Sequence, residues 1–488
     1  MQYLSLQFAL FVFLTFGLYY VLPRACRWFV LLCASLFFYL CYDVRYILFL
    51  LFVAISTFLC AKVERSKRKN KENLAIGILL CTGLWFLIKV LPWVVTVANT
   101  FLSRFIGDFQ IPIPKFLVPL GVSYYVLLSI SYVVDVYKKK IKPEKNFLVY
   151  LLYLSYFPTI VQGPISKYEQ LRNQFTAGRR IGYTDFKRNL LLISFGLIKK
   201  MVIADRVAIL ANHCFANYAD MEGVILYIGA VCYSIQLYMD FSGCVDICRG
   251  VSAMFGINLI DNFSGPYFSK SIKEFWSRWH ISLSTWLKDY IYIPLGGNRK
   301  GKGRKYINLI TTFLVSGIWH GAGINYMFWG FLQAIYQIVG ECTENVRNKV
   351  KALLKIQPNS FSDKFYRIVI TFNLTTFAWI FFRSGRFLSA LEYIERMFQS
   401  FAWWSVFDGS MFIKGFSFAQ IVFMMMNLIL ITVIDYLKTK RTVCVENSIL
   451  NAHIVLRWSI YMLLIFDILL FGVYGKGYDL SGFLYGGF

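Results

Sequence analysis

The sequence has few histidines and few acidic residues, and these low counts limit the kinds of catalytic and metal-binding site that the protein can form. It contains four histidines, and its 26 acidic residues stand against 51 basic ones. No GxSxG motif marks a serine nucleophile, no CxxC motif occurs, and the eleven cysteines are scattered, mostly within apolar segments. We therefore expect no metal site and no disulfide framework, and we interpret the cysteines as small apolar side chains.

Internal repeats, low-complexity tracts and linkers are also missing, and no segment has the composition of a water-soluble domain. Hydrophobic residues make up 58% of the chain, compared with about 45–50% in typical soluble proteins. The first segment, 1–23, has neither the basic start nor the small-residue cleavage site of a signal peptide, so we expect a retained membrane helix. The sequence predicts a single membrane domain over residues 1–488.

Long apolar runs recur along the whole chain. About twenty residues cross the hydrocarbon core of a bilayer, so the runs predict an all-α polytopic membrane protein with about 11–13 transmembrane or re-entrant helices. The runs cover residues 5–22, 28–42, 44–61, 74–91, 116–137, 146–162, 188–211, 223–240, 306–339, 364–382, 411–435 and 455–474. We place a catalytic core at about 116–340, C-terminal helices at about 364–474 and a tail at 475–488.

Basic residues cluster in short connections between the apolar runs, a distribution that favours a membrane over nucleic acid as the partner. The densest clusters are 62–73, 138–145 and 298–305. The positive-inside rule places all three on the cytoplasmic face, and the count of runs then puts the N-terminus outside.

Charged residues within apolar segments are costly in a membrane and commonly mark a pathway or a site. In segment 238–250, Asp246 lies three residues before Arg249, a spacing that allows an ion pair on one helix face. Asp240 has no partner nearby in the sequence. Asp246 is therefore half of a structural ion pair or a site residue, and Asp240 is the better candidate for a functional or helix-locking contact.

Segment 268–299 combines many charges with the three- and four-residue spacing of an amphipathic helix. The apolar stripe consists of Ile272, Phe275, Trp276, Trp279, Leu283, Trp286, Leu287 and Tyr290. The segment is too charged to span, so we expect it to lie in the cytoplasmic interface or to re-enter the membrane, ending at Pro294 and the Gly296–Gly297 turn. His280 lies beside the stripe, either as a packed histidine or as a site residue.

Another histidine interrupts the apolar run 306–339. A helix that starts at Tyr306 reaches His320 after roughly 22 Å, deep in a bilayer. Gly321 and Gly323 should then break the helix, and broken backbone at this depth requires a cavity lined by protein or water. We predict that His320 faces a cavity, with a buried structural histidine as the alternative. Neutral imidazole suits a general base that activates a hydroxyl for acyl transfer.

Two segments carry a resemblance to a known family. Residues 236–299 contain RWHISLS at 278–284 and YIPLGGNR at 292–299, and they precede FLVSGIWHGAGINYMFWG at 313–330. These motifs resemble the core of the membrane-bound O-acyltransferases (MBOAT), and more narrowly the bacterial branch of the alginate O-acetyltransferase membrane component. The likeness covers most of the chain.

The resemblance implies a fold and residue roles. The fold is a ring of tilted helices around a central tunnel with a funnel on each face. His320 matches the family's catalytic histidine, and His280 matches its second functionally important histidine, which positions the donor or the acceptor. Beside these two histidines we predict five supporting residues: Asp240, Trp319, Trp279, Asp246 and Arg278.

The resemblance also implies the substrates and the partners. The donor is a cytoplasmic acyl thioester, here most simply acetyl-CoA, with no bound cofactor. Bacterial members pass the acyl group to an extracytoplasmic serine-esterase-like partner that acts on a cell-envelope polysaccharide, which places the chain in a bacterial inner membrane. Arg299 and Lys300 could meet the donor phosphates or form a solvated loop. Tyr485 could relay the acyl group or anchor the tail at the interface.

Two alternative functions stay open. The first is D-alanyl transfer to teichoic acid from a carrier-protein thioester, although the YIPLGGNR continuation favours O-acetylation. The second is a polytopic transporter or flippase, which would share the charged and broken helices. Transporters commonly contain repeats, and this sequence shows none. Only an enzyme would leave a covalent acyl ester.

Overall fold

The computed structural model describes residues 4–62, 66–106, 110–409, 417–440 and 445–473. The regular secondary structure within these ranges is helical, which confirms the predicted all-α fold. By its internal contacts the chain forms two compact units. Among the described residues, the first unit runs to Asn189 and includes Cys248–Ile260, and the second holds Leu190–Ile247 and the residues from Asp261 to Val473. The single membrane domain remains a prediction.

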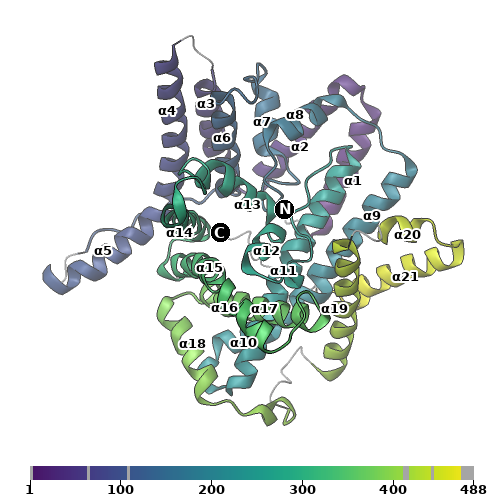
Figure 1. Ribbon diagram of the computed structural model, residues 1–488. Helices are drawn as coiled ribbons and strands as arrows, with labels where there is room; N and C mark the ends of the chain where they lie inside the picture. Colours follow the sequence, from purple (N-terminus) through teal and green to yellow (C-terminus); the bar gives the residue numbers. More distant parts are fainter. Residues whose placement is uncertain (1–3, 63–65, 107–109, 410–416, 441–444, 474–488) are drawn as a thin grey trace. The chain divides into compact units, whose positions relative to one another are not determined.

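The first unit is built from apolar helices joined by short connections. Their bounds are α1 (Leu6–Val21), α2 (Arg27–Leu40), α3 (Tyr46–Cys60), α4 (Lys67–Trp85), α5 (Leu91–Ile106), α6 (Val122–Tyr137), α7 (Phe147–Ser155) and α8 (Tyr168–Ala177). Helices α3, α4 and α6 lie side by side (Figure 1) and pack against one another. A π-helical turn at Phe86–Val90 joins α4 to α5 without a break in the helix.

Glu144 stabilises the connection between α6 and α7. Its carboxylate accepts hydrogen bonds from Tyr168 Oη at 2.6 Å and Arg172 Nε at 2.9 Å, and from the backbone N–H groups of Lys145 and Asn146. Burial raises the pKa of Glu144, but the hydrogen bonds outweigh burial and lower the pKa to about 2.

We expect Glu144→Gln to lower the melting temperature at neutral pH. A carboxyl whose folded-state pKa is depressed adds stability above its ordinary value of about 4.3 and loses it as the pH falls through the folded-state pKa. Melting curves in detergent should therefore show wild type and variant converging as the pH is lowered from about 7 toward about 3. Glu169→Gln, at an exposed position in the first turn of α8, is the matched control. A difference in melting temperature between wild type and Glu144→Gln that does not change with pH would contradict this account.

The second unit contains the remaining helices and most of the charged residues discussed above. Their bounds are α9 (Tyr183–Leu197), α10 (Asp205–Ala216), α11 (Gly223–Met254), α12 (Ile272–Arg278), α13 (Ile281–Leu287), α14 (Gly301–His320), α15 (Ile324–Cys342), α16 (Glu344–Leu353), α17 (Phe361–Arg383), α18 (Phe387–Gln399), α19 (Phe418–Thr439), α20 (Val445–Leu450) and α21 (Ile454–Phe471). Helices α9 and α11 begin in one unit and end in the other. A π-helix, Ile198–Ala204, follows α9.

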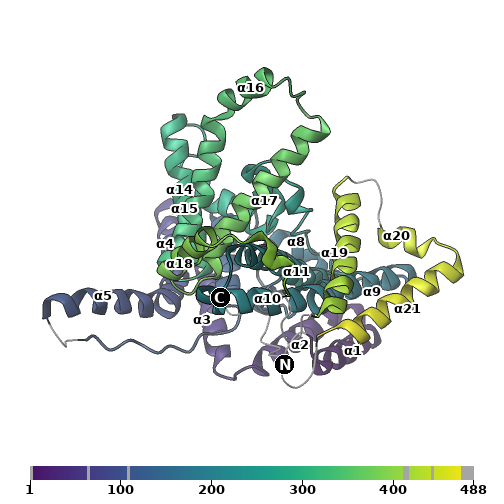
Figure 2. The same ribbon diagram turned by 90° about the horizontal axis from the view of Figure 1, so that it is seen from below.

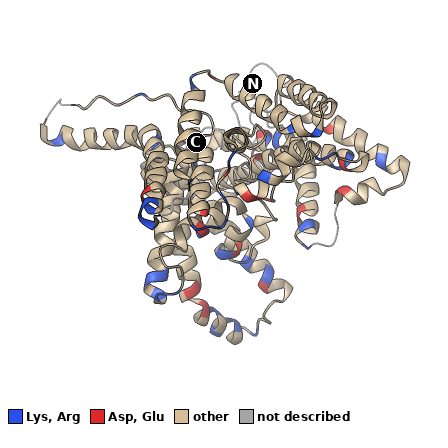
Figure 3. Cartoon of the chain, turned by 90° about the horizontal axis from the view of Figure 1, so that it is seen from above, with Lys and Arg blue, Asp and Glu red and all other residues tan. Residues whose placement is uncertain are grey.

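The helices fit a multi-pass membrane protein. Among the described residues, five helices are long and apolar enough to cross a bilayer: Lys67–Ile106, α11, α17, α19 and α21. Shorter apolar helices include α1, α3 and α6. In Figure 3, Lys and Arg gather mainly at helix ends and connections, while long stretches of helix carry neither.

The apolar run 306–339 forms two helices, α14 and α15, separated at the predicted Gly321–Gly323 break. The two helices are antiparallel, because Phe313 lies against Gly330 and Lys305 forms an ion pair with Glu341. Figure 2 shows them side by side as a hairpin. The break was predicted, but the reversal of the chain direction was not.

Small residues bring the two helices of the hairpin close together. A Cβ at Gly317 would lie 2.4 Å from the Tyr326 carbonyl oxygen, and one at Gly330 would lie 2.2 Å from the Phe313 carbonyl oxygen. Small residues are the usual means of such close backbone approach between membrane helices.

We expect Gly317→Ala to destabilise the protein, since overpacking of this kind costs about 1–3 kcal/mol. Gly303→Ala in the same helix is the matched control, because nothing lies within 4 Å of a Cβ built there. Thermal unfolding in detergent should show a lower melting temperature for the Gly317 variant alone. Equal melting temperatures of the two variants would mean that the two helices of the hairpin can move apart at no cost in stability.

Candidate active site

His320 is the last residue of α14 and lies at the tip of the hairpin, with 2% of its surface exposed. Its imidazole meets three aromatic rings, with centroid distances of 4.8 Å to Trp319, 5.2 Å to Trp329 and 5.3 Å to Phe382. The ring planes of Trp329 and His320 are perpendicular, at 89°. Two hairpin helices and α17 therefore enclose this imidazole in an apolar, water-poor environment.

His280 is equally buried, at 1% exposure, and caps the N-terminus of α13. Its backbone has φ +43°, the left-handed region that a residue with a side chain rarely adopts. Asn262 holds this conformation by accepting hydrogen bonds from Ile281 N at its carbonyl oxygen (3.0 Å) and from Ser282 N at Oδ1 (2.9 Å). The Asn262 side-chain amide also lies 3.1 Å from His280 Nδ1. Backbone strain of this kind costs about 1–3 kcal/mol and is concentrated at functional sites.

This left-handed residue corrects the prediction of one amphipathic helix. The chain instead forms α12, turns at Trp279 and His280, and continues as α13 and a π-helical turn at Lys288–Tyr292. The apolar stripe is buried as predicted, except that Tyr290 is only partly buried.

Both histidine rings lie close to the ring of Trp319. The Trp319 ring is 4.8 Å from His320 and 6.4 Å from His280, and Phe241 of α11 packs on His280 at 4.7 Å. Neutral imidazole offers one acceptor and one donor nitrogen. The arrangement brings together two groups that can take or give a proton within one aromatic enclosure.

The glycines after His320 have a role that differs from the one predicted. Gly321 and Gly323 are extended, and the ring of Tyr326 occupies the space beside Gly321, where a Cβ would lie 2.4 Å from Tyr326 Cε2. Asn325 then ties the turn to the end of α17, donating from Nδ2 to the Ser384 carbonyl oxygen at 2.8 Å. The glycines therefore make room for a side chain of the protein itself. The cavity at His320 stays a prediction.

Asp240 and Asp246 both bind lysines of the π-helix that follows α9. Asp246 accepts a hydrogen bond from Lys199 Nζ at 2.9 Å, and Asp240 forms an ion pair with Lys200. Lys200 also pairs with Asp205 at 2.8 Å. The long-range partner of Asp240 favours the helix-locking interpretation, and Lys199 is a partner of Asp246 that the sequence did not reveal.

The other predicted site residues differ from one another in burial and in contacts. Trp279 is buried and stacks on Phe275 at 5.3 Å, which makes it a core residue next to His280. Arg278 binds Glu274 of its own helix at 2.6 Å. Arg299 and Lys300 are exposed, as expected of a solvated loop or of a donor-binding mouth. Tyr485 lies outside the described residues.

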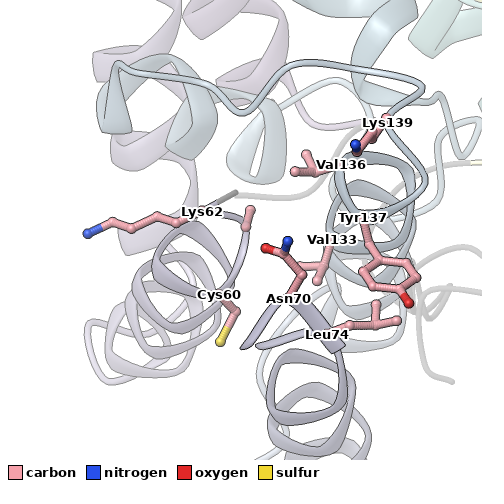
Figure 4. A pocket seen from close by; sticks show the side chains of 9 residues that line it. Cys60, Lys62, Asn70, Leu74, Val133, Val136, Tyr137 and Lys139 are labelled. Atoms are coloured by element: carbon pink, nitrogen blue, oxygen red, sulfur yellow. The ribbon is translucent and has the colours of Figure 1, made fainter. Parts of the chain in front are cut away.

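A small pocket lies beside another basic connection, in the first unit, between α3, α4 and α6 (Figure 4). It measures about 20 Å³, which is room for about one water molecule. In Figure 4 the Lys62 side chain extends away from the other lining residues. Its size rules this pocket out as a binding site for a thioester donor.

The family comparison identifies the class of enzyme. Residues 45–391 match the family model described as MBOAT, membrane-bound O-acyltransferase family, a range that includes His280, His320 and the aromatic enclosure. The chain belongs to the MBOAT family. This O-acyltransferase is therefore an enzyme and a multi-pass membrane protein, which excludes the transporter alternative.

Curated relatives agree with this assignment. The O-acyltransferase is 34% identical to a probable alginate O-acetylase of Pseudomonas syringae pv. tomato, over 81% of this chain and 74% of the relative. It is 32% identical to a peptidoglycan O-acetyltransferase of Helicobacter pylori, over 76% and 73% of the two chains. A teichoic acid D-alanyltransferase of Bacillus subtilis is 29% identical over 55% and 69%.

Proposed function

We propose that this O-acyltransferase transfers an acetyl group from cytoplasmic acetyl-CoA toward a hydroxyl of an extracytoplasmic cell-envelope polysaccharide, with His320 as general base. The observation that carries the proposal is the buried position of His320 at the hairpin tip, where aromatic rings enclose it and where Trp319 lies close to both His320 and His280. The names of the alginate and peptidoglycan relatives support a polysaccharide acceptor.

The proposed step at His320 moves the acyl group from the thioester to an acceptor hydroxyl. A ring nitrogen of His320 takes the proton of the acceptor hydroxyl as its oxygen attacks the thioester carbonyl carbon. The C–S bond then breaks, and the leaving thiolate receives that proton to give coenzyme A. The aromatic rings would exclude water, which would otherwise hydrolyse the thioester. His280 would hold the donor or the acceptor in line.

The proposal includes the direction of transfer. Helix α14 has 20 residues, so it is about 30 Å long, and it begins in the exposed basic connection that includes Arg299 and Lys300. With this connection in the cytoplasm, His320 lies toward the outer half of an inner membrane. The basic connection at 62–73, which follows three apolar runs, puts the N-terminus outside. The acyl group would leave toward a serine-esterase-like partner, with Tyr485 as a candidate relay.

The test is transfer of radiolabel from acetyl-CoA by the purified protein in liposomes, with the partner and polysaccharide added. We expect label in an alkali-labile ester on the partner or glycan. Label from a D-alanyl carrier protein, and none from acetyl-CoA, would replace this proposal with the D-alanyl alternative. Tyr485→Phe with unchanged transfer would remove the relay.

A further inference from the structure

Asn262 carries a buried amide on the connection between α11 and α12, and the sequence assigned no role to it. Its exposed fraction is 1%, and it lies eighteen residues before His280. Two backbone hydrogen bonds fix this connection without the side chain. Ile281 N donates to the Asn262 carbonyl oxygen, and Ser264 N donates to the Arg278 carbonyl oxygen, both at 3.0 Å. The contacts of the side chain therefore need an explanation of their own.

The orientation of the Asn262 amide follows from its contact with Ser282. The backbone N–H of Ser282 donates to Asn262 Oδ1 at 2.9 Å, and only the oxygen of an amide can accept a hydrogen bond. The amide nitrogen Nδ2 then lies 3.1 Å from His280 Nδ1, closer than Oδ1, which lies 3.3 Å from the same ring nitrogen. The amide atom nearest to His280 Nδ1 is therefore a hydrogen-bond donor.

This contact decides which ring nitrogen of His280 carries the hydrogen. A neutral imidazole has one donor nitrogen and one acceptor nitrogen. Because Asn262 Nδ2 can only donate, Nδ1 has to accept, and the ring hydrogen is on Nε2. The Ser282 hydroxyl, 3.5 Å from Nδ1, can donate to the same nitrogen. At Nε2, His280 therefore acts as a hydrogen-bond donor and not as a base.

We propose that Asn262 is a positioning residue that fixes the Nε2–H form of His280, and that His280 donates this hydrogen bond to the carbonyl oxygen of the acyl thioester. The donor role rests on the proposed function, whereas the position of the ring hydrogen does not. The two histidines then have different tasks. His320 takes the proton of the attacking hydroxyl, and His280 stabilises the negative charge that the attack places on the carbonyl oxygen.

The step balances without a proton transfer from His280. As the acceptor oxygen bonds to the carbonyl carbon, an electron pair of the C=O bond moves to the carbonyl oxygen, which accepts the hydrogen bond from Nε2–H. When the carbonyl group re-forms, the C–S bond breaks and the thiolate takes the proton held by His320. A donor directed at such an oxyanion typically contributes about 10²- to 10³-fold to kcat.

The first measurement is the ¹⁵N–¹H spectrum of the full-length protein in detergent with ¹⁵N-labelled histidine, at about pH 8, where an ordinary imidazole is neutral. The chain has four histidines, and the His280 signals are those that His280→Gln removes. A ring nitrogen that carries hydrogen differs in ¹⁵N shift from one that does not. We expect the hydrogen on Nε2 of His280. A hydrogen on Nδ1 would overturn the proposal.

Asn262→Asp tests whether the hydrogen on Nε2 matters for the reaction. A carboxylate can still accept from Ser282 N, but it offers His280 Nδ1 only an acceptor, so the ring hydrogen should move to Nδ1. Exchange of amide and carboxylate beside an imidazole can keep the geometry while it changes the tautomer, and this has cost about 10⁴-fold in kcat. We expect kcat to fall at least about 10²-fold, with KM nearly unchanged.

Asn308→Asp is the matched control, because it makes the same exchange at an amide that is also 1% exposed and that donates to the Gly297 carbonyl oxygen at 3.0 Å. It should leave the His280 spectrum and kcat unchanged. An equal loss of kcat in both variants would overturn the proposal. So would an Asn262→Asp protein in which either the hydrogen on Nε2 or the rate is lost without the other. The wild-type spectrum tests the hydrogen position even if Asn262→Asp does not fold.

The acetyl-CoA labelling assay on the wild type separates this inference from the proposed function. Acyl transfer by a protein with the hydrogen on Nδ1 would refute the role of Asn262 and leave the proposed function standing. No acyl transfer by a protein with the hydrogen on Nε2 would refute the proposed function and the donor role of His280, and would leave Asn262 only as the residue that sets the tautomer.

Discussion

Replacing His320 with alanine will lower the rate of acyl transfer by about 10²- to 10⁴-fold, the contribution typical of a positioned general base. The side chain is buried among Trp319, Trp329 and Phe382, so water cannot readily take its place as a base. The measurement is the initial rate of label transfer from acetyl-CoA at saturating donor, normalised to folded protein. The loss should appear in kcat, because the imidazole acts on the reacting proton.

Two further variants separate catalysis from packing. His320→Gln keeps a polar side chain of similar size but cannot carry a proton, so it should lose as much activity as His320→Ala. His213→Ala removes a partly buried histidine near Asn217 and should leave the rate unchanged. If His320→Gln kept more than about a tenth of the wild-type rate, a base at this position would be unnecessary.

Asp240→Ala will destabilise the protein by about 3 kcal/mol or more, the usual cost of breaking a buried ion pair. Asp240 is 1% exposed and pairs with Lys200. After the substitution, Lys200 would still pair with Asp205 at 2.8 Å, but with less negative charge around its buried ammonium group. The measurement is the melting temperature in detergent together with the fraction of monodisperse protein.

Removal of the partner charge on Lys200 together with Asp240 provides an internal control for this prediction. Lys200→Met combined with Asp240→Leu removes both charges and should recover most of the lost stability, since Asp205, with 22% of its side chain exposed, retains contact with solvent. Glu72→Gln, in an exposed i,i+4 pair with Arg68, should cost under about 1 kcal/mol. If Asp240→Ala were as stable as wild type but inactive, Asp240 would be a site residue and not a helix lock.

Local sequence features were sufficient to predict the helices and the break in the chain after His320. Apolar runs of spanning length correspond to helices because each hydrogen-bonds within itself, and the glycines after His320 mark where α14 ends. The enclosure was not predictable from these features. Trp329 and Phe382 are aromatic residues in a chain that is 19% aromatic, so no local pattern distinguishes them from the rest of the core.

The break in the helix at His280 shows a different limit of prediction from sequence. The apolar spacing continues from Phe275 through Trp279 to Leu283 as if the helix were unbroken. The left-handed backbone depends on Asn262, eighteen residues away along the chain. In the same way, Lys199 and Lys200 lie in an apolar run, and they pair with Asp246 and Asp240, which lie 47 and 40 residues away along the chain. Contacts at this separation leave no periodic signal.

The hairpin of α14 and α15 brings the chain back to the level at which the apolar run 306–339 begins. One continuous span at 306–339 would carry the following residues to the opposite face, whereas a hairpin returns the chain to the face it came from. The ion pair between Lys305 and Glu341 joins the two ends. Helix α16, with Arg347, Lys349 and Lys351, would then share a face with the basic connection at 298–305. A topology map that counts the run as one crossing would invert every later segment of the chain.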